Sequence, residues 1–379
     1  MNAGNQGLGR AGWRRLWLQV HKWIGLLLAI LIVPISLTGS ALVWHDWLDE
    51  ALNPAREVAA GAVPVLPASA YAAAASAALA PGERVQSIRY PEGEGPILVS
   101  AARPPESAGA GRRPVRTNIW LDPANGRVLD KAASDEGAVR FLHVLHGSLQ
   151  VPDVGRQIVG WVGVAMLVSC LSGLWLWWPV TGSVRRSFRW RRQNATSANL
   201  HHQTGFWILI PLAMLSFTGV WISFPQFFGP LSGAEAPRAG PRPAPARPLA
   251  ETRLTPDAAA EAAGSHATGA LVSITWPTDK APEWTIAFAR DGGPAEIAVA
   301  DAGGEVTPPS PPRPETIART MRRWHDGDGM GLVWQLVIFV GGIIPALLAV
   351  TGIMMWLRAR GWRRRIAKRR LNAAPAAAE

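Results

Sequence analysis

Cysteine is nearly absent from this chain of 379 residues, and its absence excludes several kinds of site. The single cysteine, Cys170, lies in an apolar stretch, so the chain can form no internal disulfide and no cysteine-rich metal centre. The Cys-x-x-Cys-His signature of covalently attached haem is missing for the same reason. A glycine-rich dinucleotide fingerprint is lacking as well, which argues against a built-in NAD(P)H site.

Charged side chains are missing from the centres of the long apolar stretches. Each stretch is long enough to cross a bilayer core of about 30 Å as a helix. Tryptophans collect at the ends, as they do at membrane interfaces. The first stretch is too long for a signal-peptide core and no cleavage pattern follows it. We therefore expect an integral membrane protein with four spans, at 17–45, 156–178, 205–228 and 331–357.

Acidic residues are fewer than basic ones: 27 aspartates and glutamates stand against 38 lysines and arginines, which gives a formal net charge of +11. The basic excess lies in three places: Arg14 and Arg15, the segment 185–192, and the segment 358–370. With four spans, all three fall on one side of the membrane, which the positive-inside rule assigns to the cytoplasm. Topology thus explains the charge without nucleic-acid binding. Both termini are expected in the cytoplasm.

The apolar stretches occur as a repeat. His21 and Gly39 are 18 positions apart, as are His201 and Gly219, and the two segments lie 180 residues apart. The chain is therefore a tandem duplication of one unit of about 180 residues.

A second pair of segments follows the same rule. His146 precedes Gly173 by 27 positions, and His325 precedes Gly352 by 27. Each unit has an even number of spans, so both units face the same way across the membrane, related by an axis along its normal. This arrangement predicts that His21 meets His201 at the cytoplasmic side and that His146 meets His325 at the outer side.

Paired imidazoles on a twofold axis suit a planar iron macrocycle. One imidazole from each repeat would complete six-coordinate iron, so the sequence predicts two non-covalent b-type haems. Gly25 and Gly205 each follow the first histidine of a repeat by four residues and lie on the same helical face. A zinc or copper site is the alternative, but two histidines without a matched carboxylate or thiol are too few ligands.

Other histidines fit the repeat less well. His202 misses the 18-residue step, and the position equivalent to His143 is Arg322. His45 corresponds to Pro225. Pro152 and Gly155, like the glycines at 327, 329 and 331, are expected to break the helix after the outer histidines. The outer site would then lie nearer the surface, where His143 or His45 is a substitute ligand, as His202 is at the inner site.

The two long outer loops show similar patterns. The first contains a helix-prone stretch at 71–80, alternating strands near 86–101, and a hairpin at 116–130 with a turn at Asn125-Gly126. The second, 229–320, repeats this order with Gly-Gly at the turn. Each is expected to form a small α+β unit that depends on the other, or on the membrane, for packing.

The predicted organisation is therefore an α-helical membrane protein with two α+β periplasmic domains. The first repeat consists of the N-terminus with the first span (1–49), an outer domain (50–140) and an outer histidine segment with the second span (141–182). A basic loop (183–200) leads to the third span (201–228), a second outer domain (229–320) and a second histidine segment with the fourth span (321–357). A basic tail (358–379) follows.

Four motifs carry a resemblance to a known family. LQVHKWIGLLLAI, FLHVLHGSLQ, NLHHQTGFW and RRWHDGDGMGLVWQ, each followed by a Ser-Gly or Thr-Gly segment, resemble the PepSY-associated transmembrane helix family, and IWLDPANGRVL resembles a PepSY strand pair. FoxB-like members are dihaem ferrisiderophore reductases of the bacterial inner membrane.

The resemblance implies an oxidoreductase that passes electrons to a ferric siderophore in the periplasm. The electron donor would be a quinol or a cytoplasmic flavoprotein. Six arginines of the outer segments would attract an anionic chelate, or else they are ordinary solvated surface charge: Arg112, Arg113, Arg116, Arg140, Arg322 and Arg323.

Two other functions compete with electron transfer. A permease for iron complexes or another solute usually needs ionisable residues or broken helices near the midplane, and the spans offer mainly Gln335 and hydroxyl groups there. A non-catalytic membrane anchor that displays PepSY modules explains the outer loops but gives the paired histidines no role.

Overall fold

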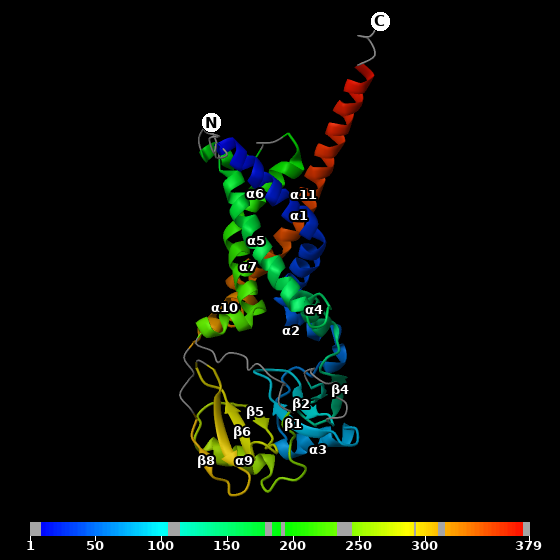
Figure 1. The fold of residues 1–379 in the computed structure, drawn as a ribbon. Coiled ribbons are helices and arrows are strands. Elements are labelled where there is room, and N and C mark those ends of the chain that lie inside the picture. Colours follow the sequence, from blue (N-terminus) through cyan, green and yellow to red (C-terminus); the bar gives the residue numbers. More distant parts are fainter. Residues whose placement is uncertain are drawn as a thin grey trace. The chain divides into compact units, whose positions relative to one another are not determined.

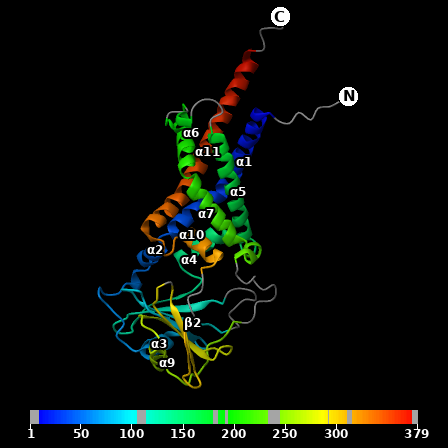
Figure 2. The same cartoon turned by 90° about the vertical axis from the view of Figure 1, so that its left-hand side faces the viewer.

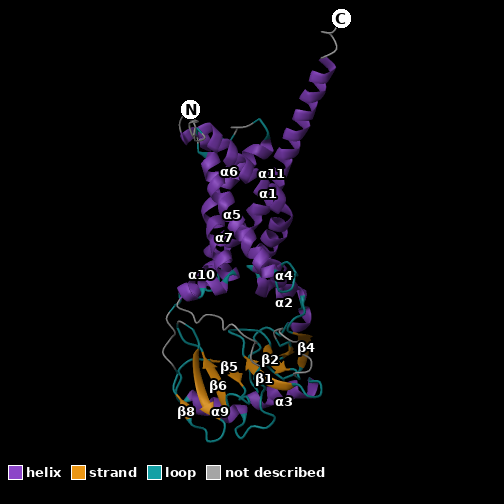
Figure 3. Ribbon diagram, in the orientation of Figure 1, coloured by secondary structure: helices purple, strands orange, loops and turns teal. Residues whose placement is uncertain are grey.

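The computed structural model describes residues 9–104, 114–178, 184–190, 194–232, 245–291, 293–309 and 315–373. The chain divides into two compact units, which are treated one at a time. The first unit is helical and the second carries all the strands described here (Figures 1 and 3). The first consists of Met1–His45, Leu142–Pro237 and Glu315–Glu379, and the second of Asp46–Phe141 and Arg238–Pro314.

Long apolar helices occupy the predicted spans. Three are continuous, namely α1 (Arg10–Leu42), α5 (Gly155–Trp177) and α11 (Gly331–Ala373). The remaining predicted span, the third, is a bent pair, α6 (Thr196–Trp207) and α7 (Leu209–Ser223). Within the described residues, three helices are thus long and apolar enough to cross a membrane, or four spans are present when the bent pair counts as one. The protein is a multi-pass membrane protein, as predicted.

The third span is not the straight helix expected over 205–228, because it bends by 65° between α6 and α7. Pro211 lies just after the break and has no N–H to donate to the carbonyl of Trp207. The bonds on either side survive: Ile208 donates to Thr204 at 3.0 Å and Leu212 to Ile208 at 2.8 Å. A missing backbone bond at Pro211 accounts for the bend.

The basic segments prolong the helices beyond the apolar stretches. α1 begins at Arg10, seven residues before the predicted start of the first span at 17 (17 − 10); residues 1–8 lie outside the described part. α11 continues through the basic tail to Ala373, sixteen residues past the predicted end of the span at 357 (373 − 357). Arginine, lysine, alanine and leucine are good helix formers, so no stop signal falls at the membrane boundary.

The helices pack as the repeat requires. Within each repeat α1 lies against α5, and α6 and α7 lie against α11; between repeats α1 lies against α11, and α5 against α7. Glycines allow the contacts between repeats. A Cβ at Gly163 would lie 2.8 Å from Val220, and one at the equivalent Gly342 would collide with Ser40. The contact of α1 with α11 therefore corresponds, in the other repeat, to the contact of α7 with α5.

Short helices connect the spans with the second unit. α4 (Ala138–Ser148) carries His146 and α10 (Ile317–Asp326) carries His325. Both end before the following span begins, so the predicted helix breaks are present. The remaining short elements are α2 (His45–Leu52), η1 (Pro54–Arg56), η3 (Val184–Phe188), α8 (Pro225–Phe228) and η4 (Pro230–Ser232).

The second unit is built on one antiparallel sheet of eight strands in the order β4-β3-β2-β1-β5-β6-β7-β8. The first repeat supplies β1 to β4 and the second supplies β5 to β8. The strands are β1 (Arg84–Arg89), β2 (Ile97–Ala102), β3 (Arg116–Leu121), β4 (Val128–Ala133), β5 (Leu271–Thr275), β6 (Glu283–Phe288), β7 (Ala295–Ala300) and β8 (Val306–Thr307).

The two expected α+β units are halves of this sheet. They join where β1 pairs with β5, with Ile88 opposite Ile274. The helices α3 (Ala68–Ala78) and α9 (Pro256–Gly264) pack on the sheet, and alternate strand residues share one buried cluster with both (Figure 2). The halves thus depend on each other for packing, which was one of the two expectations.

The two hairpin turns have the same geometry despite different sequences. In the first, Gly126 donates to the carbonyl of Asp122 and has φ 73°. In the second, Gly304 donates to the carbonyl of Ala300 and has φ 69°. Only the second residue of each expected pair adopts positive φ, so Asn125-Gly126 is not a two-residue mirror-image turn. The Gly-Gly departure in the second half leaves the turn unchanged.

Candidate cofactor site

The inner histidines meet inside the helical unit. His21 of α1 and His201 of α6 have ring centres 6.2 Å apart and planes nearly perpendicular, at 86°. Each belongs to a different repeat, as the duplication predicts. Both rings are half-buried.

Hydrogen bonds fix the tautomer of the inner pair. Nδ1 of His21 lies 3.2 Å from the carbonyl oxygen of Ser169 and 3.0 Å from the hydroxyl of Ser172. Nδ1 of His201 lies 3.0 Å from the hydroxyl of Thr351, which itself donates to the carbonyl of Leu347. With these oxygens as acceptors, Nδ1 carries the proton in both rings. Nε2 is left with its lone pair, the form that binds a metal.

The outer pair repeats this arrangement. His146 and His325 have ring centres 6.0 Å apart with planes at 40°. Nδ1 of His146 donates to the carbonyl of Ile35 at 2.9 Å. Nδ1 of His325 donates to the hydroxyl of Thr218 at 2.9 Å, and that hydroxyl donates to the carbonyl of Met214. The outer rings therefore also present Nε2.

The two pairs lie at opposite ends of α1. His21 is in the first half of the helix, and His146 packs against Gly39 near its end. Eighteen residues of helix separate these positions (39 − 21), which is about 27 Å at 1.5 Å per residue. This separation is close to the thickness of the hydrocarbon core, about 30 Å. One pair therefore lies toward each membrane boundary.

Each histidine packs against a glycine that lies within a long helix of its own repeat. A Cβ would lie 2.6 Å from Cε1 of His146 at Gly39, 3.2 Å from His21 at Gly173, 3.2 Å from His325 at Gly219 and 3.5 Å from His201 at Gly352. These four glycines let the rings approach the backbone. Gly25 and Gly205 take no part in these contacts: a Cβ at Gly25 meets no atom of the chain within 4 Å, and one at Gly205 meets only Leu348, at 3.8 Å.

Sequence reasoning missed the hydroxyl groups that hold the rings. A serine or threonine stands directly before each of these glycines, and three of the four accept a bond from Nδ1. In the fourth case Thr38 donates to the carbonyl of Ile35, which His146 uses as its acceptor. The signal was the Ser/Thr-Gly pair in all four segments: Thr38-Gly39, Ser172-Gly173, Thr218-Gly219 and Thr351-Gly352.

The substitute ligands lie elsewhere. His202 stacks on Trp177, with ring centres 5.8 Å apart, in an aromatic cluster with Phe206. His45 and His143 lie beside each other, with ring centres 6.2 Å apart, and both are exposed. The structure thus pairs the histidines that the repeat selects and places the three alternatives outside these pairs.

Each half-buried histidine pair offers too few protein ligands for a tightly held metal ion, but the number of ligands that haem iron would need from the chain. Among the described residues, no group of three or more His, Cys, Asp or Glu side chains could hold a metal ion. Two imidazoles suffice when a porphyrin supplies the other four ligands. Metal–nitrogen bonds of about 2 Å on opposite sides of one ion place two ring centres about 6 Å apart, as both pairs have them.

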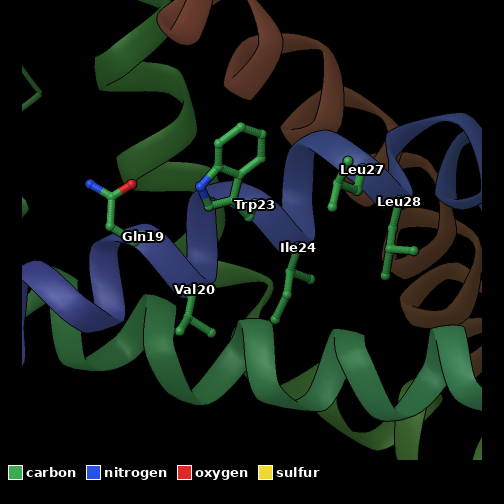
Figure 4. Close-up of a pocket in the computed structure, with 6 residues that line it drawn as sticks. All are labelled: Gln19, Val20, Trp23, Ile24, Leu27 and Leu28. Atoms are coloured by element: carbon green, nitrogen blue, oxygen red, sulfur yellow. The ribbon is translucent and has the colours of Figure 1, made fainter.

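A groove along α1 is a separate feature. Neither His21 nor His201 lines it, and its wall is apolar except for one amide (Figure 4). It belongs to the apolar surface of the span and not to the histidine pairs. Its lining residues are Gln19, Val20, Trp23, Ile24, Leu27 and Leu28.

Arginines tie the basic segments to one end of the helical unit. Arg14 donates to the carbonyl of Leu176, at the end of α5, at 2.6 Å, and Arg358 donates to the hydroxyl of Ser197, at the start of α6, at 3.2 Å. The start of α1, the end of α5, the start of α6 and the part of α11 around Arg358 therefore lie at one end of the helical unit, the end of the inner pair (Figure 1). The described parts of all three basic segments gather there.

Comparison with known protein families agrees with this architecture. The model of the PepSY-associated TM region matches residues 18–359, which is 342 of 379 residues (359 − 18 + 1). The chain belongs to this family. No curated protein matches it. The match extends over all four long spans, the four paired histidines and the sheet of this PepSY-associated protein, so the repeat and the site lie within the family region.

Proposed function

We propose that this PepSY-associated membrane protein is a transmembrane electron-transfer protein that binds two b-type haems and reduces a ferric siderophore. His21 and His201 would bind the inner haem, and His146 and His325 the outer one. The observation that carries the proposal is the pairing of four imidazoles, each held with Nδ1 donating to an oxygen. Structural histidines do not require this uniform tautomer, but axial ligands do.

The chemistry divides simply between cofactor and protein. Haem, when bound, supplies one-electron redox chemistry and the protein none of its own. The chain positions the imidazoles, and the oxygen acceptors on Nδ1 raise their basicity, which stabilises the oxidised metal. The apolar helices around both pairs exclude water. No side chain needs to act as a general acid or base.

The topology supports the direction of electron flow. Basic segments at the end of the inner pair favour a cytoplasmic location for that end in a bacterial inner membrane, with both termini inside. The donor, a quinol or a cytoplasmic flavoprotein, would then deliver electrons at His21 and His201. The outer pair would face the periplasm. Reduction to Fe(II) weakens binding to hard oxygen ligands, so one electron per chelate releases the metal.

The outer arginines give limited support for chelate binding. Arg322 pairs with Asp326 at 3.3 Å and Arg323 with Glu315 at 2.9 Å, so part of their charge is compensated at the surface. Arg116 and Arg140 are exposed, while Arg112 and Arg113 lie outside the described residues. The identity of the acceptor therefore rests on the topology and the redox chemistry.

Optical spectra of purified full-length protein test the proposal. Dithionite should sharpen the Soret and α bands, and the pyridine haemochrome should give two haems per chain. His21→Ala and His146→Ala should each remove about half of the haem, because each breaks one of two sites. His266→Ala, at an exposed histidine of the sheet unit, is the matched control and should keep both. Full haem in both ligand variants, or a colourless protein from haem-replete cells, would reject the function.

One observation favours the permease alternative. The bend between α6 and α7 is the kind of discontinuity that transporters use to expose backbone groups. The haem assay separates the two functions, because a permease needs neither a Soret band nor an intact His201. Uptake that survives His201→Ala, in a protein without haem, would establish the permease.

A further inference from the structure

A third pair of histidines lies outside both proposed haem sites. His45, the first residue of α2, and His143 of α4 have ring centres 6.2 Å apart and planes at 55°. Both side chains are exposed, unlike the half-buried rings of the two other pairs. Both belong to the helical unit.

The repeat does not account for this pair. The equivalent positions in the second repeat are Pro225 and Arg322, so the duplicated fold forms without these imidazoles. Exposed side chains are not needed to fill a core.

The pair lies beside the outer site. His143 precedes His146 by three residues on α4, so the two side chains lie on one face of the helix, about 5–6 Å apart at Cβ. The ring of His146 is fixed between Gly39 and Ile35 of α1, whereas the ring of His143 lies against His45. One turn of α4 thus contributes to two different histidine pairs.

We propose that His45 and His143 form an exchangeable site for a divalent transition metal ion, and that its ligand in the working protein is Fe(II). The identity of the ion rests on the function proposed above, because reduction of a ferric chelate near His146 generates Fe(II) at this face. Imidazole nitrogen suits borderline Fe(II), whereas hard Fe(III) prefers the oxygens of its chelate. The site therefore takes the product of reduction and not its substrate.

The transfer is a ligand exchange without a redox step. Fe(II) leaves the oxygen donors of the chelate and gains two neutral imidazole nitrogens, and water fills its remaining positions. Because no third His, Cys, Asp or Glu ligand joins the pair among the described residues, binding should be weak and reversible. Weak binding is what a site on an export or uptake path needs, since the ion must leave again.

Metal titration of the full-length, haem-loaded protein tests the site. Ni(II) is the first probe because it binds imidazole and is redox-inert here, and anaerobic Fe(II) is the second. The protein should carry a purification tag without histidine. Isothermal titration should show one Ni(II) per chain, and His45→Gln and His143→Gln should each weaken binding at least about tenfold, as loss of one of two protein ligands requires. His266→Gln, at another exposed histidine, is the control and should bind as the unmodified protein does.

Haem content of the same variants separates the possible failures. Both variants should keep two haems per chain; loss of one haem in His143→Gln would make this residue an axial ligand and overturn the metal site. Equal Ni(II) affinity in all variants would overturn it too. A protein without haem whose Ni(II) binding still depends on both residues would reject the reductase while leaving the metal site in place.

Discussion

The glycine under His146 offers a graded test of the site. An alanine at Gly39 would place its Cβ 2.6 Å from Cε1 and 3.0 Å from Nδ1 of His146. Ordinary carbon–carbon contacts need about 3.5 Å, so the ring must move by about 1 Å. The hydrogen bond from Nδ1 to Ile35, 2.9 Å long, would then exceed the limit of a normal hydrogen bond.

The expected magnitude follows from the role of this bond. Loss of a partner that orients a metal-binding histidine typically costs 10–100-fold in affinity, or about 1.4–2.7 kcal/mol. Gly39→Ala should therefore weaken haem binding at the outer site by a factor in this range. The substitution itself favours the helix by up to about 1 kcal/mol, so general unfolding is not the expected outcome.

The other glycines extend this test to a graded series. A Cβ at Gly173 or Gly219 meets a histidine at 3.2 Å and one at Gly352 at 3.5 Å, while a Cβ at Gly361, away from both histidine pairs, meets nothing within 4 Å. Haem affinity should fall most for Gly39→Ala, less for Gly173→Ala and Gly219→Ala, and remain unchanged for Gly352→Ala and Gly361→Ala. Haem titration into the apoprotein, with optical detection, measures each affinity. An effect of Gly361→Ala equal to that of Gly39→Ala would refute the reasoning.

Three further predictions concern single side chains. Thr351→Val should remove the hydrogen-bond acceptor of His201 and lower haem affinity at the inner site by about 10–100-fold. The reduction potential of the inner haem should rise in a potentiometric titration. Thr351→Ser keeps the hydroxyl, so both the affinity and the potential should stay as in the unmodified protein. Gly342→Leu should disrupt the contact between the repeats and lower the melting temperature of the detergent-solubilised chain. Gly361→Leu is the neutral control, because a Cβ at Gly361 meets nothing within 4 Å. Burial acts to raise the pKa of Asp301 in the sheet unit, but bonds from the backbone N–H of Arg253 and from the Trp284 indole prevail, so its pKa lies below the ordinary value. The stabilisation from Asp301 is then complete above the unfolded-state pKa of about 4 and is lost as the pH falls further. Asp301→Asn should lower the free energy of unfolding of the sheet unit by about 1.5–3 kcal/mol at pH 7 and by less at pH 3. Hydrogen exchange of β6 peptides measures the difference.

The histidine pairs could be predicted because the spacing of the repeat is a long-range signal. Equal distances from His21 to Gly39 and from His201 to Gly219 fix the depth of both imidazoles before any packing is known. Their hydrogen-bond partners could not be predicted in the same way. Whether Ser172 or a neighbouring residue faces His21 depends on how α5 is rotated about its axis, and apolar spans carry little amphipathic pattern that would reveal this rotation.

The bend of the third span shows a second limit. Pro34 and Pro345 lie inside α1 and α11 without interrupting them, whereas the helix breaks just before Pro211. All three lack an N–H, so the residue type alone does not separate a tolerated proline from a break. Packing of the neighbouring helices decides, and packing is not written in the local sequence.

The sheet unit was predicted strand by strand but not as a whole. Alternating residues identify β1 and β5, yet nothing near Ile88 indicates that it will face Ile274, 186 residues later (274 − 88). This pairing converts two marginal α+β units into one sheet with a common core. Non-local strand pairing of this kind becomes visible only in three dimensions.

The bonds around the paired histidines also explain why the duplication matters. Each imidazole is held by its own repeat: His21 by α5, His146 by α1, His201 by α11 and His325 by α7. Each pair, by contrast, always combines one ring from each repeat. A single repeat therefore preorganises two ligands but completes no site, and only the packing of α1 on α11 and of α5 on α7 brings the halves together. Both proposed sites consequently share one interface, so a change that separates the repeats must empty both, whereas a change to one histidine or its glycine empties one.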